Sequence, residues 1–186
     1  KPDEVELVEA TRNIIEGVNW NCSVRTNYAD TNLGLARRVS SGLDWVFDQV
    51  SQAIIVEDDC VADPTFFKYC EELLEIYKDD ERVFAISGDN YQDGNYRTEY
   101  SYYFSRYPHC WGWATWRSRW NHYDVEMKNY DEIKSKNYLW DIFGNKEEAN
   151  FRKSNFDEIR NGFNTWDFQW AYKRFLISGL LVVPIK

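Results

Sequence analysis

Apolar residues recur every three or four positions along several stretches of the chain, which is the spacing of one face of an α-helix. This pattern predicts helices over residues 3–16, 31–50, 148–163 and 164–179, the last with Asn164 or Thr165 as its N-cap. Short apolar or aromatic runs predict strands over residues 19–26, 53–56, 82–87, 100–106 and 180–186. Helices and strands therefore alternate along most of the chain.

The stretch between Ala53 and Ser87 shows this alternation most clearly. Residues 53–56 are apolar without interruption, as expected of a strand that is buried on both faces of a parallel sheet. Asp63 followed by Pro64 predicts a helix start, with aspartate as the N-cap and proline at the first helical position. The buried face of this helix is predicted to hold Phe66, Cys70, Leu73 and Tyr77.

The order of elements predicts an α/β fold, a Rossmann-like three-layer α/β/α sandwich with a mixed, mostly parallel sheet, formed by residues 1–186 as a single domain. The second half is less regular, and we expect a helix from Trp113 to Trp120 there. Ligands of such folds bind beyond the carboxyl ends of the strands. Glu57, Asp58 and Asp59 follow directly on one predicted strand end, so they are the first candidates for a site.

Composition narrows the function classes. A net charge of −9 argues against a surface for nucleic acids or anionic membranes, which are bound by clustered Lys and Arg. Aromatic residues make up 18% of the chain, so some rings could stack on a ligand and others fill the core. The four cysteines lack the CxxC spacing of zinc sites, and we interpret them as free thiols. No apolar run is long enough to span a membrane.

The three consecutive carboxylates suggest a bound cation. Like charges at one strand end repel one another unless they are protonated, spread apart or neutralised. Mg²⁺ and Mn²⁺ are bound by one or two carboxylates while substrate phosphates supply further oxygen ligands. Glu57, Asp58 and Asp59 could therefore form half of a diphosphate site, or they could simply form a polar turn before the next helix.

The stretch "IIVEDDCVADPTFFKYCEELLEIYKDDERVFAISGDN" (residues 54–90) closely resembles the core of GT-A fold glycosyltransferases, in particular the N-acetylglucosaminyltransferase that initiates complex N-glycans and its bacterial relatives. That family shares the apolar strand, the Glu-Asp-Asp variant of the Asp-x-Asp motif, the proline and the Phe-Phe pair. The resemblance implies that Asp59 ligates Mn²⁺ (or Mg²⁺) on the donor's two phosphates. It also implies that Asp58 faces the ribose or the metal shell and Glu57 the donor sugar.

Two further blocks extend the resemblance. "CWGWATWRSRW" (residues 110–120) is similar to the family's Gly-x-Gly-Trp segment, with Cys110 in place of the first glycine. It implies that Trp111, Gly112 and Trp113 bind substrate, although packing of a tryptophan in the core is an equal alternative.

"NTWDFQWAYKRF" (residues 164–175) resembles the family's Trp-Asp-Asp-Trp helix start, with Phe168 in place of the second aspartate. The resemblance implies that Asp167 is the catalytic base of an inverting transfer and that Trp166 packs on the sugar. From the residues alone, an aspartate in a helix's first turn is more often a partner of the helix dipole.

Weaker similarities add Asp89 as a contact to substrate and Arg37 as a contact to a donor phosphate; a solvent-exposed helix face is the alternative for Arg37. In the family, the first strand carries much of the uridine contact, and its counterpart here would precede Lys1. We therefore expect a domain that is truncated at its N-terminus.

The function expected from the resemblance is metal-dependent inverting transfer of a sugar from a nucleotide-diphosphate donor, such as UDP-GlcNAc, to a glycan hydroxyl. Three alternatives remain: a carbohydrate-binding module with a structural Ca²⁺, a metal-dependent phosphohydrolase, and a catalytically inert fragment. Free cysteines and the bacterial relatives favour a bacterial cytoplasm, with the Golgi lumen as the alternative.

Overall fold

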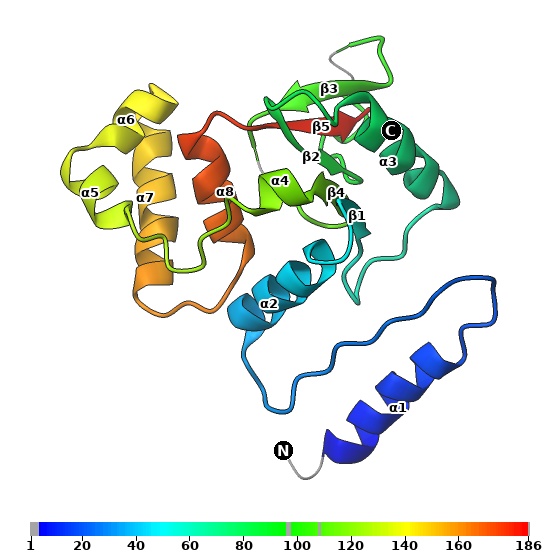
Figure 1. Ribbon diagram of the computed structural model, residues 1–186. Coiled ribbons are helices and arrows are strands. Elements are labelled where there is room, and N and C mark those ends of the chain that lie inside the picture. The colour runs from blue at the N-terminus through cyan, green and yellow to red at the C-terminus, as the bar shows by residue number, and fades with distance from the viewer. Residues whose placement is uncertain (1–3, 96–97, 108, 186) are drawn as a thin grey trace. The chain divides into compact units, whose positions relative to one another are not determined.

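The computed structural model describes residues 4–95, 98–107 and 109–185 (Figure 1). The chain divides into two compact units, residues 1–31 and residues 32–186, and each is described by itself. Among the described residues, no helix combines the length and the apolar character needed to cross a lipid bilayer.

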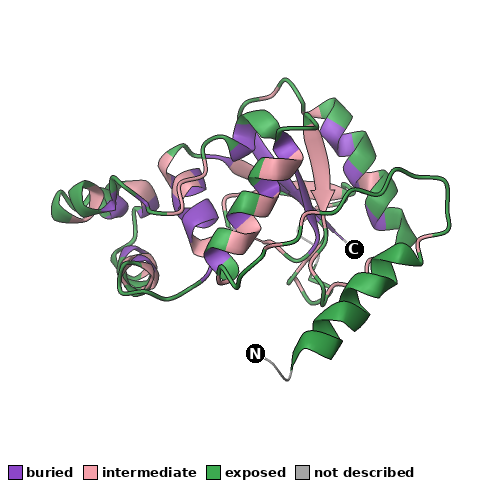
Figure 2. Ribbon diagram, turned by 60° about the horizontal axis from the view of Figure 1, so that its bottom comes forward, coloured by how far each residue is buried: buried purple, intermediate pink, exposed green. Residues whose placement is uncertain are grey.

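The first unit contains one helix, α1 (Val5–Glu16), as the apolar spacing predicted. Its expected inward face is nonetheless exposed, with Val5 at 52% and Val8 at 45% relative exposure, and no residue of α1 is buried. Figure 2 shows this helix in the colour of exposed residues along its length. The strand expected over residues 19–26 is absent from this described segment, because no neighbouring strand hydrogen-bonds to it.

The second unit carries the remaining elements. Its strands are β1 (Gln52–Ile55), β2 (Val83–Ser87), β3 (Tyr102–Ser105), β4 (Trp113–Trp116) and β5 (Leu180–Pro184). Its helices are α2 (Leu35–Phe47), α3 (Pro64–Ile76), α4 (Arg117–Trp120), α5 (Tyr130–Ser135), α6 (Tyr138–Phe143), α7 (Lys146–Arg160) and α8 (Asp167–Leu176). The expected helices and strands from residue 31 onward are confirmed, except over residues 113–120.

The five strands form one mixed sheet in the order β1-β4-β2-β5-β3. β2 and β5 are parallel, whereas β4 runs antiparallel to both β1 and β2, and β3 runs antiparallel to β5. The expectation of a mostly parallel sheet is therefore wrong for the described strands. β4 accounts for most of the antiparallel pairing, because it lies between β1 and β2 and runs antiparallel to both. We had expected this segment to be helical.

Residues 113–116 form a strand because their side chains face two different cores in alternation. Trp113 belongs to the cluster beneath α2 and α8, whereas Ala114 and Trp116 belong to the cluster beneath α3. All four residues of β4 are buried. Helical spacing and strand alternation are hard to distinguish in so short an aromatic run.

Helices cover both faces of the sheet, and α3 covers one of them. Asp63 caps this helix by accepting a hydrogen bond from the backbone N–H of Thr65 (2.9 Å), and Pro64 is its first residue, as predicted. Phe66, Cys70 and Leu73 are buried against Ile86 of β2 and Val182 of β5.

The opposite face packs on α2, α4 and α8 through a cluster rich in tryptophan, which consists of Leu43, Phe47, Phe84, Ala85, Trp113, Trp120, Trp166, Trp170, Leu181 and Val183. β1 lies at the sheet edge and its residues are only partly buried, which corrects the expectation of a strand covered on both faces. Figure 2 shows the burial concentrated on the inner strands and on the helix sides that face them.

A third cluster joins α5, α6, α7 and α8, and it includes Tyr130, Phe143, Phe156 and Tyr172. Sequence analysis missed α5 and α6, because each is only six residues long and is stabilised by tertiary packing rather than by a long apolar repeat.

The central strand β2 gives a direct test of this core. Ile86 has no exposed surface, so we expect Ile86→Ala to lower the free energy of unfolding by about 2–5 kcal/mol through lost burial and a residual cavity. The matched control is Ile76→Ala on α3, where the side chain is 62% exposed and the change should stay within about 0.5 kcal/mol. Urea unfolding measures both, and equal destabilisation would contradict the assigned core.

Candidate functional site

The three carboxylates lie in a turn directly after β1. The backbone N–H of Cys60 donates to the carbonyl of Glu57 (3.1 Å) and closes this turn. Asp58 and Asp59 are exposed, whereas Glu57 is partly buried. The Cys60 thiol donates weakly to Asp59 Oδ1 (3.7 Å). The predicted metal and donor residues are therefore presented together on one short loop at the sheet edge.

Asp167 lies close enough to this loop to interact with it electrostatically. Partial burial raises the pKa of Glu57, and the negative charges of Asp59, Asp167 and Asp58 raise it further. A hydrogen bond with the Trp166 side chain acts in the opposite direction. Residues separated by more than a hundred positions are thus brought to one place, as expected if the acidic loop and Asp167 belong to one site.

Two side chains position Asp167 at the start of α8. Thr165 donates its hydroxyl hydrogen bond to Asp167 Oδ1. Neither Asn164 nor Thr165 is the N-cap of α8, contrary to our expectation, because Trp166 occupies that position. Asn164 Oδ1 instead accepts a hydrogen bond from the backbone N–H of Ala36 (2.9 Å) at the start of α2. Gly34 allows this approach, because a Cβ there would lie 2.4 Å from Asn164 Nδ2. The residue before α8 is therefore anchored to a second helix.

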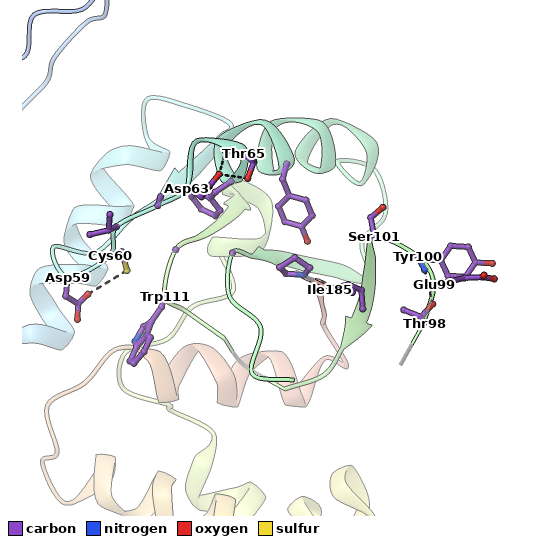
Figure 3. Close-up of a pocket in the computed structure, with 17 residues that line it drawn as sticks. Asp59, Cys60, Asp63, Thr65, Thr98, Glu99, Tyr100, Ser101, Trp111 and Ile185 are labelled. Carbon is purple, nitrogen blue, oxygen red and sulfur yellow. Dashed lines mark hydrogen bonds between the residues drawn. The ribbon is translucent and has the colours of Figure 1, made fainter. Parts of the chain in front are cut away.

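A cavity of about 1240 Å³ opens beside the acidic loop. It is bounded by the start of α3, the end of β2, the segment before β3 and the end of β5. In Figure 3, Asp59, Cys60 and Trp111 lie toward one end, and Thr98 to Ser101 lie toward the other. Asp59, Trp111 and Gly112 are the predicted site residues among those lining this cavity.

Trp111 and Gly112 form another part of the cavity wall. Trp111 is 58% exposed, so one of its faces is free for a ligand. Gly112 has a φ of 72°, a conformation that favours glycine, and its carbonyl accepts from the backbone N–H of Gly88 (2.7 Å). A Cβ at Gly88 would lie 2.4 Å from the ring of Phe66, so the two loops meet without room for a side chain.

Trp113 and Trp166 lie in the core. They are 1% and 3% exposed, and their rings stack on each other with centroids 5.5 Å apart and an interplanar angle of 18°. This placement favours the core-packing alternative for Trp113. Trp166 touches the site through its side-chain hydrogen bond to Glu57, so it orients a carboxylate where we had expected it to pack on a sugar.

Asp89 lies behind the cavity wall and is not one of the cavity-lining residues that the structure describes. Its side chain is only 16% exposed and lies 3.4 Å from His109 Nδ1, measured to Oδ1. Burial tends to raise the pKa of Asp89, but hydrogen bonds with His109, Ser87 and Tyr91 outweigh this effect and lower it. Sequence analysis had proposed Asp89 as a contact to substrate and gave no role to Tyr91 or His109.

Arg37 lies on the exposed side of α2, and α2 contributes none of the described residues that line the cavity. Its predicted contact to a donor phosphate is therefore not supported by a position in the cavity wall.

The thiol of Cys110 adjoins the acidic site but is unsuited to nucleophilic chemistry. Burial raises its pKa to about 12, and the charges of Asp167, Glu57 and Asp89 contribute to the rise. A thiol with such a pKa stays protonated near neutral pH. All four cysteines are free, as predicted.

Within the described parts of the chain, no group of three or more His, Cys, Asp and Glu side chains is arranged to hold a metal ion. The donor set nevertheless suits a hard cation, because it consists of carboxylates whose mutual repulsion already raises the pKa of Glu57. Asp59, with Asp58 or Glu57 beside it, offers the one or two carboxylates that Mn²⁺ or Mg²⁺ takes when phosphates supply other ligands.

Comparison with known families agrees with this geometry. The GNT-I family matches residues 23–154, which is more than two thirds of the chain and includes the acidic loop, Asp89 and Trp111. Asp167 lies outside the matched range. No individual curated protein matched the chain. The resemblance seen in the sequence is thereby confirmed, and the chain belongs to the GNT-I family of glycosyltransferases, of the N-acetylglucosaminyltransferase type.

Proposed function

We propose that this protein is a metal-dependent inverting glycosyltransferase that moves a sugar from a nucleotide-diphosphate donor, such as UDP-GlcNAc, to a glycan hydroxyl. The observation that carries the proposal is that Asp59, which lines the cavity, and Asp167 both lie near enough to Glu57 for their charges to raise its pKa, in addition to the effect of burial. Family membership supports a nucleotide-sugar donor and a glycan acceptor. We also propose that the sheet and its two helical layers form the core of a GT-A fold.

The acidic loop is the proposed donor site. Asp59 holds the metal, Asp58 faces the ribose or the metal shell, and Glu57 contacts the donor sugar. When bound, the metal neutralises negative charge on the diphosphate and so improves it as a leaving group. Arg37, exposed on α2, is the proposed contact to a donor phosphate.

Asp167 is the proposed base. The acceptor hydroxyl attacks the anomeric carbon, the bond between that carbon and the phosphate oxygen breaks, and the hydroxyl proton passes to the Asp167 carboxylate. One displacement inverts the anomeric configuration. The hydrogen bond from Thr165 holds the Asp167 carboxylate in one orientation. A fixed carboxylate favours the short distance to the acceptor hydroxyl that proton transfer requires.

The family assignment also bears on the alternatives. A glycosyltransferase family supports transfer over a binding module or a phosphohydrolase. The N-acetylglucosaminyltransferases of this family usually work in the Golgi lumen, so the assignment supports that compartment over the expected bacterial cytoplasm.

Loss of Asp59 should weaken donor binding. We expect Asp59→Ala to reduce Mn²⁺-dependent binding of UDP by at least about 10-fold, because a metal ligand is removed. Tryptophan fluorescence during titration with UDP, with and without Mn²⁺, measures the change. Asp79→Ala, an exposed aspartate beyond α3, is the control and should bind as wild type does. Equal affinity of the Asp59 variant would contradict the assigned metal site.

Loss of the base should separate binding from chemistry. We expect Asp167→Asn to lower kcat by about 10²- to 10⁴-fold, because the amide cannot take the acceptor proton. UDP and Mn²⁺ should bind within about 2-fold of wild type, a difference of less than about 0.5 kcal/mol. Sugar transfer to a glycan panel and UDP titration give the two values. A variant that retains full kcat would remove Asp167 as the base.

The raised pKa of Glu57 predicts a pH-dependent effect on stability. Ionised Glu57 is disfavoured in the folded state, so its charge costs stability once the pH rises through the unfolded value near 4.5. We expect Glu57→Gln to raise the free energy of unfolding at pH 7 by no more than about 1 kcal/mol, because the site is partly solvated. The gain should vanish below about pH 4.

Thermal unfolding at several pH values checks this effect. Glutamine keeps an oxygen that can accept from Trp166, so the comparison isolates the charge. Destabilisation at pH 7 would show that Glu57 is not repelled by its neighbours. Saturating Mn²⁺ should remove the advantage of the variant, because a bound cation favours the charged residue.

A further inference from the structure

Two largely buried side chains, Asp89 and His109, form a chain of contacts with the exposed Tyr91. The Tyr91 ring stacks on the imidazole of His109 with centroids 5.1 Å apart and an interplanar angle of 25°. His109 Nδ1 in turn lies 3.4 Å from Asp89 Oδ1, and Ser87 donates its hydroxyl to the same oxygen. His109 thus links Asp89 on one side to the Tyr91 ring on the other.

The Tyr91 ring of this group contacts a cavity-lining residue, Trp111. The Tyr91 ring meets Trp111 edge to face, with centroids 6.2 Å apart and an interplanar angle of 73°. Trp111 is 58% exposed and lines the cavity toward the same end as Asp59, as Figure 3 shows. A largely exposed indole that is not held by its neighbours can sample several rotamers, and ordering it on binding reduces affinity.

We propose that Asp89, Tyr91 and His109 are positioning residues that hold the Trp111 indole as a flat surface for the apolar face of a pyranose ring next to Asp59. The inference rests on the proposed function for the identity of the ligand as the sugar of a donor or an acceptor. It adds Tyr91 and His109 to the site. Asp89, which we had expected to contact substrate, becomes a positioning residue.

A direct catalytic role for His109 fits the geometry less well. Its side chain is 11% exposed, one ring face is covered by Tyr91, and Nδ1 faces Asp89. Neither His109 nor Tyr91 is among the described residues that line the cavity, so they act on a ligand through Trp111.

A double-mutant cycle tests whether Tyr91 acts through Trp111. In transfer assays with UDP-GlcNAc and a panel of methyl glycosides and neutral trisaccharides, we expect Tyr91→Leu to raise KM about 2- to 10-fold, with kcat changed less. Tyr91→Phe keeps the ring and should restore most of the loss. Adding Tyr91→Leu to Trp111→Ala should raise KM no further. Additive effects would overturn the proposal.

A second measurement does not depend on transfer. In protein labelled with 5-fluorotryptophan, the ¹⁹F resonance of Trp111 is identified by its absence in Trp111→Phe. We expect Tyr91→Leu to shift this resonance toward the position of free 5-fluorotryptophan, with His109→Asn producing a smaller shift. Tyr138→Leu, a partly exposed tyrosine on α6, is the control and should leave it unchanged.

The two measurements separate the possible failures. An unmoved Trp111 resonance in folded Tyr91→Leu and His109→Asn overturns the positioning role, whether or not transfer occurs. If wild type transfers no sugar and binds no UDP with Mn²⁺, the proposed function fails, while a shifted resonance still supports the contact between Tyr91 and Trp111. Thermal unfolding of each variant confirms that it is folded.

Discussion

The stacking of Trp113 on Trp166 is the contact on which the site depends. Trp113 belongs to β4, between β1 and β2, and Trp166 immediately precedes α8. Because both rings are buried, this pair fixes the start of α8 against the sheet. Asp167 is the next residue after Trp166, and the Trp166 side chain also forms a hydrogen bond with Glu57. The stacked pair of tryptophans, contributed by distant segments, therefore helps to fix the position of Asp167 relative to Glu57.

Local patterns predicted much of the fold from the sequence. The Asp63-Pro64 cap, the buried stripe on α3 and the apolar runs of β2 and β5 all depend on neighbours in the sequence, so they could be recognised there. The acidic loop and its family were also recognisable, since the motif is contiguous. Its coupling to Asp167 followed only from the resemblance, because no local pattern links residues so far apart.

The remaining features depend on tertiary contacts. The direction of the strands was mispredicted because β4 was not recognised as a strand. Its side chains point alternately into two hydrophobic clusters, and a short aromatic run does not reveal this alternation. Exposure decided between equal alternatives for the tryptophans, with Trp111 at the cavity and Trp113 in the core. Tyr91 and His109 were missed because their relation to Asp89 exists only after folding.

The hydrogen bond between Asn164 and the N-terminus of α2 affects the conformational entropy that is lost when the reacting groups are positioned. Asn164 lies three residues before Asp167, and its side chain is fixed to Ala36 across the unit. The loop that carries the proposed base is thus ordered before any substrate arrives, so substrate binding need not supply the free energy to order it. Gly34 and Asn164, which touch no substrate, would then influence turnover by limiting the conformations available to the reacting carboxylate.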